Sequence, residues 1–153
     1  TYGLAKYDLK TRTFSPSVFS DEKYDVADLT SLRWTRNIVG ASVVRERYTE
    51  KWLSTELDEL IGRVRKTFPG HICWVQSASA DMKIVIIGIE SAQDPGRYFI
   101  YEHSKGTLEM LGVVRPEIIP ELMAQMTPFR FNSRDGLEIE GYVVRPPQSD
   151  GRR

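Results

Sequence analysis

The stretch Met126-Thr-Pro-Phe-Arg-Phe-Asn-Ser-Arg-Asp-Gly-Leu-Glu-Ile-Glu-Gly-Tyr-Val-Val-Arg-Pro146 has the pattern of a β-hairpin with its turn in the middle. The sequence ends soon afterwards, at Arg153. A hairpin followed by so little sequence suggests a domain that starts just as the chain stops. We therefore expect a long first region and only the opening strands of a second one.

Turn chemistry leaves two possible registers for this hairpin. A two-residue loop at 135–136 would place Phe131 opposite Glu140 and mix apolar and polar residues on each face. A three-residue loop at 134–136 places Phe131 opposite Ile139 instead. Because directly opposed residues share a face, only the longer loop gives one apolar and one polar side. The predicted register therefore pairs Ser133 with Leu137, Asn132 with Glu138, Phe131 with Ile139 and Arg130 with Glu140.

Composition restricts the class of protein and its partners. With 153 residues the chain is long enough for one domain with a buried core. Lys+Arg and Asp+Glu number 21 each, so the net charge is zero and nothing indicates binding to nucleic acid or to an anionic membrane. Charged residues at 27% and hydrophobic residues at 41% are typical of a soluble globular protein.

The single cysteine, Cys73, excludes an intrachain disulfide. Its position within His71-Ile-Cys-Trp-Val75 favours a buried structural thiol over a nucleophile. No apolar run reaches the ~18 residues of a membrane span, and no secretory signal is visible. The first residue is Thr1 rather than Met, which suggests a trimmed chain, so a cytoplasmic or periplasmic location stays open.

An amphipathic helix is predicted in the middle of the chain, over about residues 52–68. Apolar residues recur there every three or four positions: Trp52, Leu53, Leu57, Leu60, Ile61, Val64 and Phe68. Ser54 or Thr55 is a suitable N-cap, and Pro69-Gly70 ends the helix.

Strand patterns occupy the sequence on both sides of this helix. Four candidates follow it, separated by tight turns: His71–Ser77, Lys83–Ser91, Arg97–Glu102 and Thr107–Leu111. This spacing predicts an antiparallel four-stranded meander. Three segments precede the helix: two short strands within 4–19 around a polar turn at 10–12, a weakly strand-like 25–34, and a strongly strand-like 38–45.

The segments 5–14 and 99–108 resemble each other. Their alignment places Tyr7 on Tyr101, Asp8 on Glu102 and Thr13 on Thr107, 94 positions apart. That offset equals about two units of ~40–50 residues, the length of a propeller blade. The strand patterns predict a mainly β fold with blade-like antiparallel meanders, one inserted helix and a C-terminal hairpin. The length of the repeat is compatible with propeller blades but does not establish a propeller by itself.

Three stretches in order along the chain resemble serine peptidases of the prolyl oligopeptidase type, in the branch related to acylaminoacyl peptidases. Asp94–Tyr101 is similar to the strand-loop-strand of the last propeller blade, and Leu111–Pro116 to the exit from that blade. Met126–Pro128, running into Ser133–Tyr142, is similar to the start of the catalytic α/β-hydrolase domain. The Pro-, Met- and Glu-rich segment between them marks a domain boundary.

The resemblance implies three parts: a partial β-propeller at 1–114, a linker at 115–128 and the start of an α/β-hydrolase domain at 129–153. The family's nucleophilic Ser sits on a sharp strand-to-helix turn and is followed in the chain by Asp and His. No Gly-x-Ser-x-Gly occurs here, and the family's triad lies beyond Arg153. The parent protein is thus expected to cleave peptides through an acyl-enzyme, while this chain alone is expected to be inactive.

No other catalytic, cofactor-binding or metal-ligating residue is predicted. His71 and His103 are the only bases near neutral pH. Ser104 follows His103, but neighbouring side chains on a strand point to opposite faces, so a solvated turn is favoured. No group of histidines, cysteines and carboxylates has metal-ligand spacing.

Two groups of charged residues receive mainly structural interpretations. Glu56, Asp58 and Glu59 favour the positive end of the helix as a solvated face. Arg45, Glu46 and Arg47 follow a buried-looking strand and could reach a propeller's central cavity, where the family filters peptides. No motif matches a substrate-binding residue closely, so a structural or rim role is favoured.

Two hypotheses remain open. In the first, the chain is a non-catalytic propeller fragment of a peptidase, with peptides and an α/β-hydrolase domain as its partners. In the second, it is a non-enzymatic β-propeller-type interaction or scaffold module. A propeller needs at least about four blades of ~40 residues, so 153 residues that include a helix and a linker cannot close one. The isolated chain should therefore expose sheet edges, and these should drive homo-oligomerisation.

Overall fold

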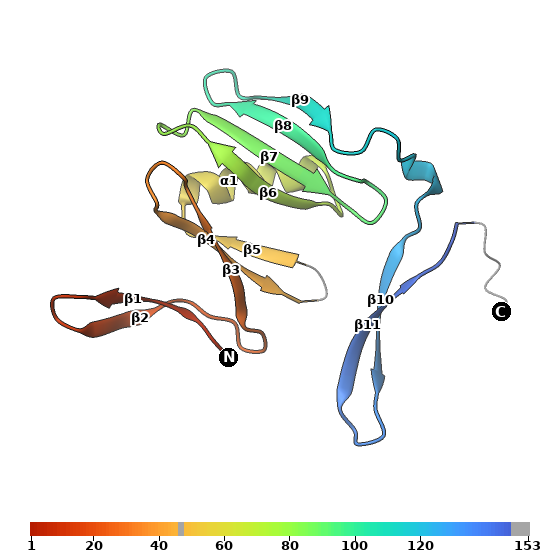
Figure 1. Cartoon of the computed structure of the whole chain (residues 1–153), viewed down its shortest axis with the longest axis horizontal. Coiled ribbons are helices and arrows are strands. Elements are labelled where there is room, and N and C mark those ends of the chain that lie inside the picture. The colour runs from red at the N-terminus through yellow and green to blue at the C-terminus, as the bar shows by residue number, and fades with distance from the viewer. Residues whose placement is uncertain (46–47, 148–153) are drawn as a thin grey trace.

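The computed structural model describes residues 1–45 and 48–147 and is mainly β, as predicted (Figure 1). Its strands form four antiparallel sheets in chain order. These are β1 (Leu4–Asp8) with β2 (Thr13–Phe19); β3 (Val26–Ser31), β4 (Ile38–Val44) and β5 (Tyr48–Trp52); β6 (Ile72–Ala78), β7 (Ile84–Glu90), β8 (Arg97–Glu102) and β9 (Thr107–Val113); and β10 (Met126–Asn132) with β11 (Glu138–Val144).

The predicted four-stranded meander is confirmed as the sheet β6-β7-β8-β9, in which every strand pairs with its neighbour in sequence. We call it the blade sheet. Its apolar strand β7 buries Val85, Ile87 and Ile89 on one face. On the other face Gly88 accommodates the indole of Trp74, since a Cβ at Gly88 would lie 2.2 Å from that ring.

Helix α1 (Thr55–Thr67) is shorter at its start than the predicted range of 52–68. The Ser54 side chain caps it by accepting a hydrogen bond from the backbone N–H of Leu57. Trp52, assigned to the helix from its spacing, ends β5 instead and pairs with Gly40 of β4. The reason is a competing period of two: Tyr48, Glu50 and Trp52 alternate along β5, which the helix pattern obscured.

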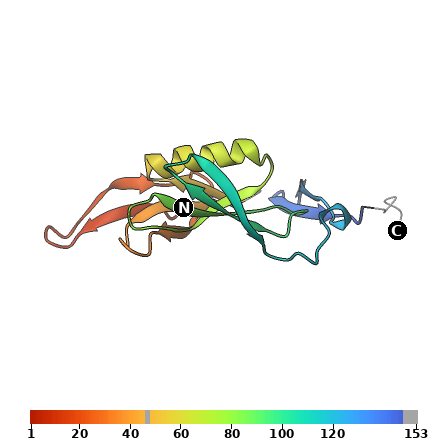
Figure 2. The ribbon, with the colours of Figure 1, turned by 90° about the horizontal axis from the view of Figure 1, so that it is seen from above.

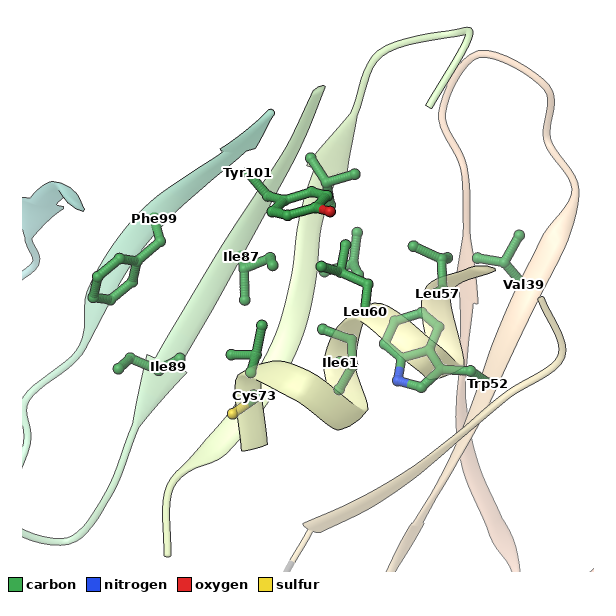
Figure 3. Close-up of a cluster of buried hydrophobic side chains, with 13 residues drawn as sticks. Val39, Trp52, Leu57, Leu60, Ile61, Cys73, Ile87, Ile89, Phe99 and Tyr101 are labelled. Atoms are coloured by element: carbon green, nitrogen blue, oxygen red, sulfur yellow. The ribbon is translucent and has the colours of Figure 1, made fainter. Parts of the chain in front are cut away.

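The core lies between α1 and the two larger sheets. Figure 2 shows α1 lying along one side of the strands. In Figure 3 the helix residues Leu57, Leu60 and Ile61 lie between side chains of the blade sheet and Val39 and Trp52 of the preceding sheet. Leu57 and Ile61 are fully buried, and each such side chain contributes about 1.5–3 kcal/mol relative to exposure.

The internal repeat has a structural counterpart in strand pairing. In the β1–β2 hairpin Asp8 pairs with Thr13, and in the β8–β9 hairpin Glu102 pairs with Thr107. The residue before the second strand is left-handed in both: Arg12 has φ 57° and Gly106 has φ 65°. The β1–β2 hairpin therefore corresponds to the last two strands of the blade sheet.

The C-terminal hairpin has the predicted three-residue loop. The backbone N–H of Ser133 donates to the carbonyl of Leu137 at 2.9 Å, and Gly136 is left-handed with φ 83°. Phe131 pairs with Ile139 in the resulting register. The other predicted pairs, Asn132 with Glu138 and Arg130 with Glu140, are present as well.

A connector joins the blade sheet to this hairpin. It contains one short 3-10 helix, η1 (Pro120–Leu122). Strand β10 already begins at Met126, inside the predicted linker of residues 115–128.

Candidate functional site

An open hollow of about 680 Å³ lies where the end of the blade sheet meets the C-terminal hairpin. Segments far apart in sequence line it: the start of β5, the turn before β6, the end of β7, and the start of β10 with Tyr142 of β11. We call it the junction hollow. The turn before β6 and the end of β7 lie at the end of the blade sheet from which the connector descends to β10 and β11 (Figure 1).

One wall of the junction hollow is fixed by a buried carboxylate. Asp94 is only 8% exposed and accepts hydrogen bonds from Arg97 Nε at 2.8 Å and from the backbone N–H of Gly96 at 3.1 Å. His71 Nε2 lies 3.2 Å from Asp94 Oδ2. These contacts join the turn before β6 to the loop before β8 and fix the position of one segment relative to the other.

The protonation of Asp94 follows from this environment. Burial acts to raise its pKa, but the hydrogen bonds from Arg97 and Gly96, with the charge of Arg97, hold the pKa below its usual range. Asp94 is therefore an anion at neutral pH. Because the Asp94 carboxylate is already engaged by Arg97, Gly96 and His71, we assign it a structural role in this wall.

The other side of the junction is held by Glu140 of β11. Its carboxylate accepts hydrogen bonds from the Tyr24 hydroxyl at 2.9 Å and from Lys23 Nζ at 3.3 Å. Arg130 Nη2 lies 3.0 Å from the same oxygen. The hydrogen bond from Tyr24, together with that from Lys23, lowers the pKa of Glu140. Thus the hairpin is attached to the segment before β3 by charged and polar contacts.

A second contact reinforces this attachment. The Tyr142 hydroxyl donates to the backbone carbonyl of Arg45 at 3.3 Å, and the Arg45 guanidinium forms an ion pair with Asp21. Arg45, for which the sequence allowed a role in a central cavity, therefore lies at the junction. Its neighbours Glu46 and Arg47 lie outside the described residues.

The two histidines singled out from the sequence are far apart. His71 lines the junction hollow, whereas His103 follows β8 at the opposite end of the blade sheet, 3.6 Å from Glu56 of α1. Ser104 lies in the β8–β9 turn, as expected. Asp58 and Glu59 are exposed near the start of α1, in agreement with a solvated face.

Cys73 is buried beneath α1, in agreement with a structural thiol. Burial raises the pKa of its thiol, and its Sγ lies 3.8 Å from the carbonyl oxygen of His71. A thiol kept protonated in this way is a poor nucleophile.

Within the part of the chain that the structure describes, no group of three potential ligands could hold a metal ion. Helix α1 is too short and too polar to cross a membrane. The junction hollow offers hydrogen-bonding groups and apolar surface, and its described residues offer no nucleophile paired with a base.

Sequence reasoning missed three residues that organise this region: Glu50, Asp94 and Glu140. Asp94 opens one of the stretches that carry the family resemblance, but the sequence assigns it no contact. For Glu140 the sequence predicts only its cross-strand partner, Arg130. Glu50 lies just before the predicted helix, between residues 45 and 52 where no strand was predicted, although its alternation with Tyr48 and Trp52 is a signal for a strand.

Both the sequence and the fold of the chain are similar to those of known peptidases. No family model matches the chain. The chain is 25% identical over 133 residues to dipeptidyl aminopeptidase BIII of Pseudoxanthomonas mexicana, which covers 87% of this chain and 19% of that protein. The chain thus spans about a fifth of the length of that relative.

The fold is similar to that of a chain solved for "Structural and Mechanistic Analysis of Two Prolyl Endopeptidases: Role of Inter-Domain Dynamics in Catalysis and Specificity". The TM-score is 0.55 at 12% identity, and the match covers 95% of this chain and 21% of the other. The comparisons therefore support a resemblance to the prolyl oligopeptidase family, and the mainly β, blade-like fold matches that of a known peptidase.

Proposed function

We propose that this chain is the last part of the β-propeller of a serine peptidase of the prolyl oligopeptidase family, in the branch related to acylaminoacyl peptidases. In this proposal residues 1–114 belong to the propeller, 115–128 form the linker and 129–153 open the α/β-hydrolase domain. The parent protein hydrolyses peptide bonds with a Ser-Asp-His triad located beyond Arg153. This chain positions peptides and restricts their access.

The observation that carries the proposal is the change of structure after the blade sheet. A scaffold propeller would return to blade-like strands after the connector. Here the connector leads to a hairpin of β10 and β11 that is separate from the blade sheet, and Glu140 and Tyr142 attach this hairpin to the segments around Tyr24 and Arg45. Such a hairpin suits the beginning of a second domain that rests on the propeller.

In this proposal the chain itself has no catalytic role. A nucleophilic Ser needs a strand-to-helix turn, which in the family follows the opening strands of the hydrolase domain. The junction hollow faces the hairpin and is lined by both regions. A peptide held there lies between the propeller and the second domain, so the chain can select peptides by size and orientation before cleavage.

A fluorophosphonate that labels activated serines tests this proposal. In the natural-length protein that contains this sequence, we expect labelling at one Ser beyond Arg153, with loss of labelling and of peptide-anilide cleavage when that Ser is replaced by Ala. The 153-residue chain alone should not be labelled. A natural-length protein that is unreactive and continues with further blade-like repeats would instead support the scaffold hypothesis.

We also propose that the isolated 153-residue chain self-associates through its exposed strands. Met110 and Leu111 on β9 are each 61% exposed, on a strand with one free edge in the blade sheet. Light scattering over a concentration series should show a mass that rises above 17.6 kDa. A constant monomeric mass at high concentration would contradict the proposal.

A further inference from the structure

A smaller hollow of about 290 Å³ adjoins the junction hollow and shares Tyr48, Ile72 and Glu90 with it. It lies between the sheet of β3 to β5 and the free edge of β6. Thr30 and Glu50 line it from the first sheet, and Trp74 and Val75 line it from the second. We call it the Glu50 pocket.

Glu50 is the feature that sets this pocket apart. The residue is only 4% exposed, and its Oε1 accepts a hydrogen bond from the Thr30 hydroxyl at 2.5 Å. Its Oε2 is fully buried and has no hydrogen-bond partner among the described residues. A buried polar atom without a partner is costly, and a carboxylate oxygen is a strong acceptor in surroundings of low dielectric constant.

The charges around Glu50 are mostly negative. Glu90 lines the same pocket, and Asp28 on β3 lies close enough to oppose ionisation of Glu50. The nearby cation is Arg65 of α1, whose Nη2 donates to the backbone carbonyl of Glu50 at 3.5 Å. Burial raises the pKa of Glu50, while the hydrogen bond from Thr30 and the charge of Arg65 act against that rise. A cation in the pocket would offset this excess of negative charge.

The remaining walls are aromatic and aliphatic. Tyr48 and Trp74 contribute rings, and Ile72 and Val75 contribute aliphatic surface. Aromatic faces attract cations, and aliphatic walls accept the carbon stem of an amphipathic side chain. A hydrated metal ion would gain little from such walls, because hard cations prefer a shell of oxygen ligands.

We infer that the Glu50 pocket binds an organic cation with N–H donors on an apolar stem, an alkylammonium or alkylguanidinium group, with the carboxylate of Glu50 as its counter-ion. Glu90 supports the same charge at the rim. The inference rests on the pocket alone, so it stands or falls separately from the peptidase proposal.

Calorimetric titration of the natural-length protein with small probes at constant ionic strength tests the chemistry. n-Butylamine and n-butylguanidine should bind, whereas n-butanol, of similar shape but neutral, should not. Tetramethylammonium, a cation without N–H donors, should bind at least about tenfold more weakly, because it loses the charge-assisted hydrogen bond. Binding of calcium alone, equal binding of n-butanol, or no binding of either amine probe at millimolar concentration would each overturn the inference.

Variants then assign the binding to Glu50. Glu50→Gln should weaken n-butylamine binding at least about tenfold, and Glu90→Gln only about two- to threefold, because that carboxylate is exposed to solvent. Glu109→Gln, an exposed position on β9, is the matched control and should change nothing.

Glu50→Asp keeps the negative charge but moves the carboxylate one methylene closer to the backbone, so this variant should bind n-butylamine more weakly than the wild type but still measurably. It provides a second test if Glu50→Gln does not fold. A folded Glu50→Gln variant, verified by circular dichroism, that binds n-butylamine like the wild type would refute the inference.

Discussion

The blade sheet and the C-terminal hairpin use the same antiparallel pairing but are stabilised in different ways. In the blade sheet Ile87 and Ile89 are fully buried beneath α1. In the hairpin Phe129 and Phe131 stack on each other and remain 41% and 48% exposed. A two-stranded hairpin is marginal in water unless a second layer covers its apolar face. Regular pairing therefore does not by itself make a stable unit, and the hairpin depends on its polar contacts with the rest of the chain.

The largest effect is expected from removing core volume in the blade sheet. Ile87→Ala leaves a cavity beneath α1 and should lower the free energy of unfolding by about 2–5 kcal/mol. Ile84→Ala is the matched control on the same strand, because Ile84 is 42% exposed and should cost far less. Urea denaturation followed by circular dichroism measures both. Equal losses for the two variants would show that the core has been placed on the wrong face.

The blade sheet and the hairpin each have a glycine beneath an aromatic ring, so a Gly→Ala substitution compares how tightly the two rings are packed. A Cβ at Gly88 would lie 2.2 Å from the Trp74 indole, and one at Gly141 would lie 2.8 Å from the Phe129 ring. Gly88→Ala should cost about 1–3 kcal/mol, because the half-buried indole is packed against the sheet.

Gly141→Ala should cost clearly less than Gly88→Ala, because the exposed Phe129 ring can swing into solvent. Gly62→Ala on α1, where a Cβ meets nothing within 4 Å, is the control and should stabilise by about 0.5–1 kcal/mol. Thermal unfolding measures all three, and a larger loss for Gly141→Ala would reverse the comparison.

The stability of the fold should depend on pH through the buried carboxylate of Asp94, in the wall of the junction hollow. The pKa of Asp94 is lower in the folded chain than in the unfolded chain, so its contribution is fully present above the unfolded value and is lost as the pH falls through the folded value. Stability of the wild type should thus decline from about pH 4 downward.

Asp94→Asn should be less stable at neutral pH by about 1.5–3 kcal/mol, the usual worth of a hydrogen bond to a charged group, and should show a flatter acid profile. Glu109→Gln, at an exposed position, should keep the wild-type profile. Parallel acid profiles of Asp94→Asn and the wild type would exclude Asp94 as the source.

The smallest global effect is expected at the hairpin. Glu140→Gln removes the negative charge to which Tyr24 and Lys23 donate hydrogen bonds, and so weakens the attachment of the hairpin. Amide hydrogen exchange should therefore speed up across β10 and β11, while the melting temperature of the whole chain stays unchanged. Added salt should act in the same direction, because ion pairs at the surface are screened.

Glu138→Gln is the control for the hairpin experiment, since its contacts with Lys23 and Arg130 are long, at 3.8 and 3.7 Å. Exchange that is unchanged in Glu140→Gln would mean that the hairpin is held by other contacts.

Local patterns predicted much of the fold because they depend on neighbours in sequence. The hairpin register was predicted from turn residues such as Gly136 and from the requirement that opposed residues such as Phe131 and Ile139 share the apolar face. The same logic predicted the meander and the end of α1. It failed at residues 48–52, where one stretch satisfied both a helical and a strand period.

The candidate sites could be predicted much less well. Nothing local to Glu50 indicates that it is buried without a partner for one oxygen, and nothing local to Glu140 indicates Tyr24, which lies 116 positions away. Both facts arise from sheets that approach one another in space.

The sequence alone determined the four-stranded meander, the capped helix and the register of the C-terminal hairpin, because turns, caps and alternation are set by residues a few positions apart. Only the tertiary structure decided that α1 covers the blade sheet, that the hairpin is attached through Glu140, and that Glu50 is enclosed between two sheets. Burial and charge pairing depend on which surfaces meet, and surfaces meet across distances that no local pattern records.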